Sequence, residues 1–122
     1  MFVARRLVTS IAGSRAVSAT AARSDKFFHL SYTYVEGILE KRAPHREGHL
    51  AHAQAHIDKG QVLMGGAFAD AGGAVIVFRC ADAGVVNQFV KDDPYVHAGL
   101  VVDHNVREWN VVIGTDAVIG GA

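Results

Sequence analysis

The order in which strand-like and helix-like segments follow one another is the feature that most restricts the fold of this chain. Four segments rich in aromatic and β-branched residues predict strands: residues 27–35, 61–68, 74–80 and a stretch within 100–113. Two segments predict helices: residues 44–60, from Pro44 to the stop at Gly60, and residues 83–91, with Asp82 as the N-cap. The order β-α-β-β-α-β predicts an α+β, ferredoxin-like split βαβ fold with an antiparallel sheet and both helices on one face.

The sheet face without helices must meet water, a ligand or another subunit. Phe27 and Phe28 are adjacent and therefore point to opposite faces, and residues 74–78 contain no polar side chain. A sheet that is apolar on both faces predicts a homodimer formed through the open sheet face.

A chain of 122 residues has room for one such domain, which we expect over residues 26–114, with residues 115–122 as a flexible C-terminal tail. The first 24 residues contain four arginines and no acid, so the rest has 12 − 4 = 8 Lys or Arg against 12 Asp or Glu, a net charge of −4. An acidic domain lacks the clustered positive charge that phosphate contacts need. We therefore exclude nucleic acid as a main partner.

Residues 1–25 are rich in Arg, Ser and Ala and nearly free of acid, which is typical of a mitochondrial transit peptide. This composition predicts a location in the mitochondrial matrix. A plastid location, or a basic tail on a cytoplasmic protein, is the alternative. No apolar run approaches the roughly 20 residues that a membrane-spanning helix needs, so no membrane insertion is expected. The single cysteine, Cys80, excludes an internal disulfide and a multi-cysteine zinc site.

The helix predicted over residues 44–60 has four histidines on one side: His45, His49, His52 and His56. A parallel stripe of Leu50, Ala53 and Ile57 is expected to face the core, which would leave the histidines at its boundary with solvent. Histidines four apart can share a metal ion, but no carboxylate is adjacent in the His-Glu-x-x-His arrangement. The alternative is a polar flank from which one histidine is recruited to a site, and we expect no metal.

A second constellation is the segment Asp92-Asp93-Pro94-Tyr95, which ends the following helix. Because proline fixes the turn, the carboxylate before it is held in a defined direction. A rigid aspartate beside an imidazole can orient the ring and fix its tautomer. The alternative is that the segment only terminates the helix.

Three stretches, LEKRAPHREGHL (39–50), GQVLMGGAF (60–68) and DDPYVHAGLV (92–101), resemble the YCII-related (YciI-like) domain family in the same order. The resemblance implies a fold of the dimeric α/β barrel superfamily and a catalytic pair of His49 and Asp93. It further implies an anionic substrate group bound by Arg46, with Arg42 and Tyr95 at family-like positions of the same substrate site. The other three helix histidines do not correspond to shared family histidines, and no cofactor is implied.

Two functional hypotheses follow. In the first, the protein is an enzyme of isomerase or lyase type in which His49, oriented by Asp93, performs general acid/base chemistry on a small cyclic or aromatic acid. In the second, it is a non-catalytic ligand-binding or structural dimeric subunit in an organelle. The sequence contains no visible nucleophile or cofactor motif and does not define the substrate.

Overall fold

The computed structural model describes residues 25–120, so the predicted transit peptide lies outside the described residues except for Asp25. Residues Lys26–Asn110 form one compact unit. Residues 111–120 belong to a second unit, in which a short π-helical turn, η2 (Asp116–Gly120), lies within the predicted tail. No helix in the described part of the chain is long and apolar enough to cross a membrane.

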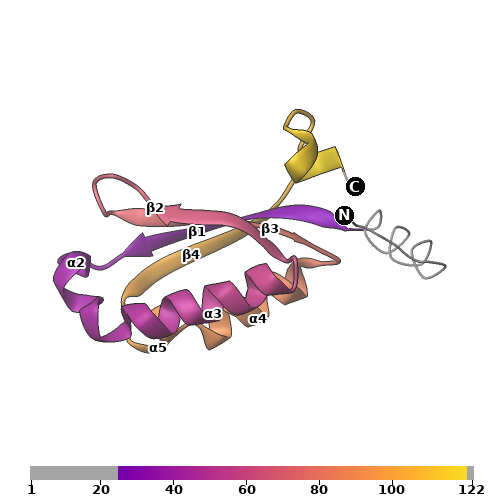
Figure 1. Cartoon of the computed structure of the whole chain (residues 1–122). Helices are drawn as coiled ribbons and strands as arrows, with labels where there is room; N and C mark the ends of the chain where they lie inside the picture. Colours follow the sequence, from indigo (N-terminus) through magenta and orange to yellow (C-terminus); the bar gives the residue numbers. More distant parts are fainter. Residues whose placement is uncertain (1–24, 121–122) are drawn as a thin grey trace, which may run out of the picture. The chain divides into compact units, whose positions relative to one another are not determined.

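The compact unit is a four-stranded antiparallel sheet in the order β2-β3-β1-β4, with helices on one face (Figure 1). The strands are β1 (Lys26–Tyr34), β2 (Val62–Ala67), β3 (Gly73–Cys80) and β4 (Val101–Trp109). β1 lies inside the sheet and pairs with both β3 and β4, so the first and last of the described strands are neighbours. The predicted ferredoxin-like α+β fold is confirmed.

The core lies between this sheet and the helix α4 (Ala83–Asp92). Alternate side chains of β1 and β3 point to the helix side, where Phe28, Leu30, Ile76 and Phe78 are buried. They pack against the apolar side of α4, formed by Val86, Phe89 and Val90. The predicted N-cap is also confirmed, because the Asp82 carboxylate accepts a hydrogen bond of 2.8 Å from the Gly84 amide.

The helix predicted over residues 44–60 begins at Arg46 rather than at Pro44. Pro44 lies in a 3-10 turn, η1 (Ala43–His45), which leads directly into the main helix, α3 (Arg46–Asp58). A short helix, α2 (Ile38–Lys41), precedes the predicted segment. The predicted stop is correct, since Gly60 has a φ of 76° just after the helix. Pro94 likewise begins a new short helix, α5 (Pro94–His97), directly after α4 ends at Asp92.

Of the stripe expected to face the core, Ala53 packs against it as predicted, but the expectation is wrong for Leu50 and Ile57. They are 48% and 43% exposed, and no residue of α3 is fully buried. The histidine side packs inward instead: the ring of His52 stacks on Phe89 at 4.4 Å, and its Nε2 forms a hydrogen bond of 2.9 Å with the Phe89 carbonyl. An imidazole ring can stack on an aromatic ring and also form a hydrogen bond with a backbone carbonyl. An aliphatic side chain can do neither.

The sheet face away from the helices is the surface on which we expect the homodimer. Strand alternation places Phe27, Val75, Val77 and Trp109 on it, and Met64 of the edge strand beside them. Polar side chains of β1, β3 and β4 share this face, including Arg79, whose guanidinium lies 5.8 Å from the centre of the Phe27 ring. The face is therefore mixed rather than uniformly apolar.

Candidate functional site

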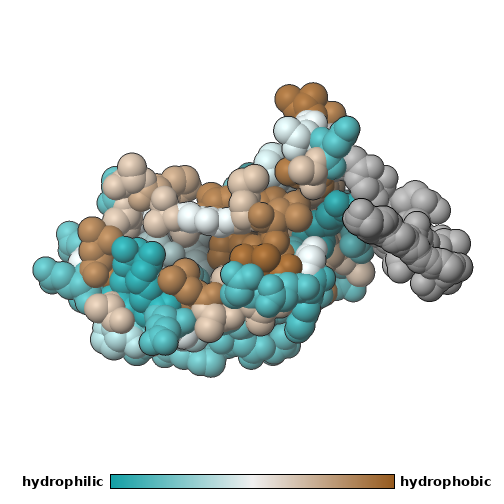
Figure 2. Space-filling model, in the orientation of Figure 1, coloured by the Kyte–Doolittle hydropathy of each residue, from teal (hydrophilic) through white to brown (hydrophobic). Residues whose placement is uncertain are grey.

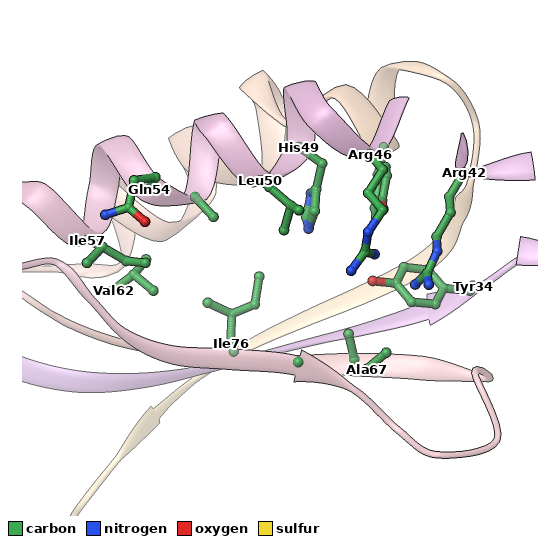
Figure 3. A pocket seen from close by; sticks show the side chains of 15 residues that line it. Tyr34, Arg42, Arg46, His49, Leu50, Gln54, Ile57, Val62, Ala67 and Ile76 are labelled. Carbon is green, nitrogen blue, oxygen red and sulfur yellow. The ribbon is translucent and has the colours of Figure 1, made fainter. Parts of the chain in front are cut away.

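A cavity of about 450 Å³ lies between α3 and the sheet. Four of the five predicted site residues line it: Arg42, Arg46, His49 and Tyr95. Figure 3 shows the side chains of α3 and of the preceding turn reaching down toward β2 and β3. The fifth residue, Asp93, has no exposed surface and lies behind His49, away from the cavity.

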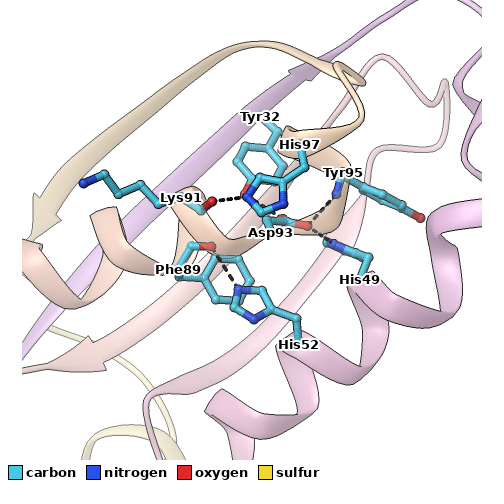
Figure 4. A network of polar contacts seen from close by, with 8 residues as sticks. All are labelled: Tyr32, His49, His52, Phe89, Lys91, Asp93, Tyr95 and His97. Carbon is cyan, nitrogen blue, oxygen red and sulfur yellow. Dashed lines mark hydrogen bonds and ion pairs between the residues drawn. The ribbon is translucent and has the colours of Figure 1, made fainter.

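His49 and Asp93 form a direct hydrogen bond, with 2.8 Å between His49 Nδ1 and Asp93 Oδ1 (Figure 4). The two residues come from α3 and from the link between α4 and α5, 44 positions apart. Because an ionised carboxylate only accepts, neutral His49 must donate its proton from Nδ1. This tautomer leaves Nε2 as an acceptor, and no described residue bonds to it.

The Asp93 carboxylate accepts two further hydrogen bonds. Its Oδ2 accepts from the Tyr32 hydroxyl at 2.8 Å, and its Oδ1 accepts from the Tyr95 amide at 2.9 Å. Burial by itself raises the pKa of Asp93, but the hydrogen bond and charge of His49, followed by the bonds from Tyr32 and Tyr95, outweigh it and lower this pKa below its ordinary value. Asp93 is thus a buried carboxylate that remains ionised and holds the Nδ1 edge of the His49 ring in place.

The ring of His49 is fixed by stacking as well as by hydrogen bonding. It lies parallel to the ring of Tyr95, with 3.8 Å between centroids and 4° between planes. The Asp93-Pro94-Tyr95 turn therefore supplies both contacts, because its carboxylate bonds the imidazole and its tyrosine covers one face. A ring restrained in two directions has little freedom left to lose when it reacts.

Two tyrosines of β1 belong to this site and were not predicted as site residues. Tyr32 donates to Asp93, and Tyr34 lines the cavity. Burial, with smaller contributions from Tyr95 and Asp93, raises the pKa of Tyr34 to about 12, and Arg42 and Arg46 partly oppose that rise. Tyr34 is therefore a neutral hydroxyl near the two arginines. Strand alternation puts both tyrosines on the helix side, but it does not name their partners.

Arg42 and Arg46 point into the same end of the cavity as Tyr34 (Figure 3). Neither forms an ion pair with any carboxylate of residues 25–120. Two guanidinium groups with no protein counter-ion, beside a neutral hydroxyl, can bind an anionic ligand by forked hydrogen bonds.

Two of the other three histidines predicted on this helix, His52 and His56, have protein partners. His52 bonds the Phe89 carbonyl, and His56 Nδ1 bonds the Gln61 side chain at 2.9 Å. Within the described residues, no group of three or more His, Cys, Asp or Glu side chains is arranged to hold a metal ion. Of the four predicted helix histidines, only His49 lines the cavity, and His52 and His56 serve in packing.

A matched pair of buried tyrosines gives a stability prediction. The Tyr95 hydroxyl is buried with no hydrogen-bond partner among the described residues, whereas that of Tyr32 donates to Asp93. We expect Tyr95→Phe to raise the free energy of unfolding by about 1 kcal/mol, because it removes an unpaired polar group and keeps the stacked ring. Tyr32→Phe should lower it by about 1–3 kcal/mol. Urea denaturation measures both, and equal losses in the two variants would contradict the assignment of partners.

The fold and the site together define a class: a ferredoxin-like α+β domain in which a histidine bonded to a buried aspartate lines a cavity together with two arginines. The model of the YCII-related domain family matches residues 27–110, and the chain belongs to this family.

Among solved structures, the chain resembles the 5-chloro-2-hydroxyhydroquinone dehydrochlorinase TftG from Burkholderia phenoliruptrix AC1100, in complex with 2,5-dihydroxybenzoquinone. The TM-score is 0.60 at 24% sequence identity, over 69% of this chain and 93% of the TftG chain. At this identity the likeness shows the fold, which agrees with the predicted ferredoxin-like α+β arrangement. A search of curated protein sequences finds no match.

Proposed function

We propose that this protein is a small-molecule enzyme of isomerase or lyase type that moves a proton on a small cyclic or aromatic acid. The observation that supports this best is the position of His49, which bonds buried Asp93 through Nδ1 and lines the cavity. A histidine held in one tautomer between a buried carboxylate and an open cavity is the arrangement of a general base.

In the proposed mechanism, the arginines Arg42 and Arg46 bind the carboxylate of the substrate and set its position. Nε2 of His49 then removes a proton from a carbon next to a carbonyl group, and the Asp93 carboxylate stabilises the imidazolium that forms. For an isomerisation, the proton returns to a different carbon. For an elimination, a leaving group departs with its electron pair from the neighbouring carbon and a double bond forms. The neutral Tyr34 hydroxyl and the arginines can stabilise the negative charge that develops on the substrate oxygen.

The likeness to TftG supports the lyase variant of this proposal. By its name, that enzyme removes hydrogen and chloride from a hydroxylated ring, and its structure holds a dihydroxybenzoquinone. By their names, the substrate of that enzyme and the bound molecule are both small hydroxylated rings. We therefore include elimination from a ring carbon in the proposed reactions of this protein.

The proposal is tested by proton exchange, which needs no knowledge of the full reaction. The protein is incubated in D₂O with cyclic and aromatic acids that carry a hydrogen next to a carbonyl, and NMR follows the incorporation of deuterium. Catalysed exchange supports general base chemistry. If acids bind in the cavity and none of them exchanges or is converted, the second hypothesis of a non-catalytic binding subunit is favoured.

The two arginines give a prediction that concerns binding. We expect Arg46→Gln to weaken the binding of acids by about 10- to 100-fold, because a charge-assisted hydrogen bond is lost. The matched control is Lys59→Gln, which removes an exposed positive charge just after α3 without touching the cavity. Isothermal titration calorimetry compares each acid with its uncharged amide. Unchanged acid affinity in Arg46→Gln would rule out the proposed anion site.

The expected partner is a second copy of the chain, bound through the sheet face that carries Val77. We expect the protein to elute with twice the mass of one chain, and Val77→Glu to elute as a monomer, because a buried charge opposes association. Leu39→Glu is the control, since Leu39 is exposed on α2, away from this face. Size-exclusion chromatography with light scattering decides: a dimer that survives Val77→Glu would place the interface elsewhere. A matrix location, proposed from residues 1–25, completes the proposal.

A further inference from the structure

We infer that the substrate is an amphipathic anion whose apolar part is larger than a single ring and extends along α3 toward Ile57. This inference rests on the proposed function, because it takes the cavity with His49 as the site of reaction. It adds the shape and polarity of the substrate, which the acid/base pair does not define.

The first argument is volume. An apolar cavity of about 150 Å³ is sufficient to bind benzene. The cavity beside His49 has about 450 Å³, roughly three times that space. A monocyclic acid would therefore leave most of it filled with water in contact with apolar side chains, which is unfavourable.

The second argument is the position of His49 along the cavity. The α3 residues that line it begin with Arg46 and end with Ile57. At 1.5 Å per residue, His49 lies about 5 Å along the helix axis from Arg46 and about 12 Å from Ile57. If the charged group binds at the arginines, the reacting atom lies close to it, and the longer part of the cavity remains beyond His49.

The third argument is that this longer part is mainly apolar. Gln54 also lines it, but its amide donates a hydrogen bond of 2.9 Å to the Asp58 carboxylate. Leu50 and Ile57 expose nearly half of their surface there, and Val62 and Ile76 form the floor opposite them. Gly65 in β2 has no side chain beside Ile76. A Cβ at this position would lie 3.1 Å from Ile76 Cγ1 and would crowd this lining residue. In Figure 2 hydrophobic surface gathers between β2 and the C-terminal half of α3. Exposed aliphatic side chains on both walls of a groove favour an apolar ligand.

The occupant is thus defined at both ends. The two arginines require a negative charge at one end, and the aliphatic walls exclude charge at the other. A ring with an alkyl chain of a few carbons, or two fused rings, bearing one carboxylate, satisfies both conditions.

The test is the binding of benzoate, 4-ethylbenzoate and 4-butylbenzoate, measured by isothermal titration calorimetry. We expect affinity to rise about two- to fourfold for each added carbon, since each buried methylene adds a hydrophobic contribution of this size. Ile57→Gln and, separately, Leu50→Gln should reduce this gain in affinity per added carbon. The control is Ala55→Gln, which alters an exposed position of α3 that does not line the cavity and should keep the full gain.

An affinity that is constant or falls from benzoate to 4-butylbenzoate in the unmodified protein would overturn the inference. So would an undiminished gain in both glutamine variants. The inference and the proposed function fail separately, because His49→Gln should strongly reduce the rate of proton exchange and still show the dependence on chain length. Loss of that dependence in the unmodified protein, with exchange retained, would leave His49 as the base and limit the substrate to a single ring.

Discussion

Replacement of Asp93 by alanine is expected to lower the free energy of unfolding by about 3–5 kcal/mol, the largest stability effect of any single change at the site. The Asp93 carboxylate is fully buried and accepts from three donors: His49, the Tyr32 hydroxyl and the Tyr95 amide. Alanine leaves all three without a partner in the interior. It also removes the N-cap of α5, whose side chain accepts from the Tyr95 amide.

Asparagine at the same position shows how much of the loss comes from the negative charge, because it removes the charge and keeps the size of the side chain. Asp93→Asn retains a side chain of equal size with one oxygen acceptor, so we expect a loss of about 1–2 kcal/mol at neutral pH. Urea denaturation of both variants and the unmodified protein gives these values. A loss in Asp93→Ala no larger than that in Asp93→Asn would show that the three hydrogen bonds contribute little.

The pH dependence of stability tests the ionisation of the same carboxylate. The pKa of Asp93 is lower in the folded protein than its ordinary value of 3.8. The unfolded chain therefore takes up the proton first, so this group stabilises the fold fully above about pH 4 and loses its effect as the pH falls through the folded pKa. The difference in stability between the unmodified protein and Asp93→Ala should shrink below pH 4. A difference as large in acid as at neutral pH would contradict this.

The positions of the strands along the chain could be predicted from sequence, because a strand shows a local period of two residues. Phe28, Leu30 and Tyr32 alternate with more polar neighbours, and this pattern has one interpretation. The orientation of α3 could not be predicted. Its histidine band and its stripe of Leu50 and Ile57 lie side by side on the helix, so a helical wheel allows either to face inward. The side that faces inward depends on Phe89, which is 37 positions away in sequence from His52. Its ring stacks on His52 and its carbonyl bonds the same imidazole.

The sequence predicted some of the side chains that lie together at the candidate site, but not all of them. His49 and Asp93 were identified because proline fixes the aspartate and because both match a family pattern. Tyr32 and Tyr34 were missed because nothing near them in sequence distinguishes a core tyrosine from one whose hydroxyl meets a carboxylate 61 positions away. Long-range polar partners of this kind arise from the sheet register, which local patterns do not set.

His49→Gln is expected to reduce the rate of proton exchange or turnover by about 10²- to 10⁴-fold, the size of a general acid/base contribution. Glutamine has a similar reach and can still donate a hydrogen bond to Asp93, but its amide cannot accept a proton at neutral pH. Binding of benzoate should change little, because the charged group is held by Arg42 and Arg46. The loss should therefore appear in kcat rather than in KM.

His52→Gln is the matched control on the same helix. His52 lies one turn further along α3, and its ring is committed to Phe89 rather than to the cavity. We expect this variant to lose stability through the lost stacking contact and to retain its rate of exchange. If the two variants lose activity equally, the effect of His49→Gln comes from disturbed packing of α3. If His49→Gln remains active, the base is a different group, and Asp93 then has a structural role alone.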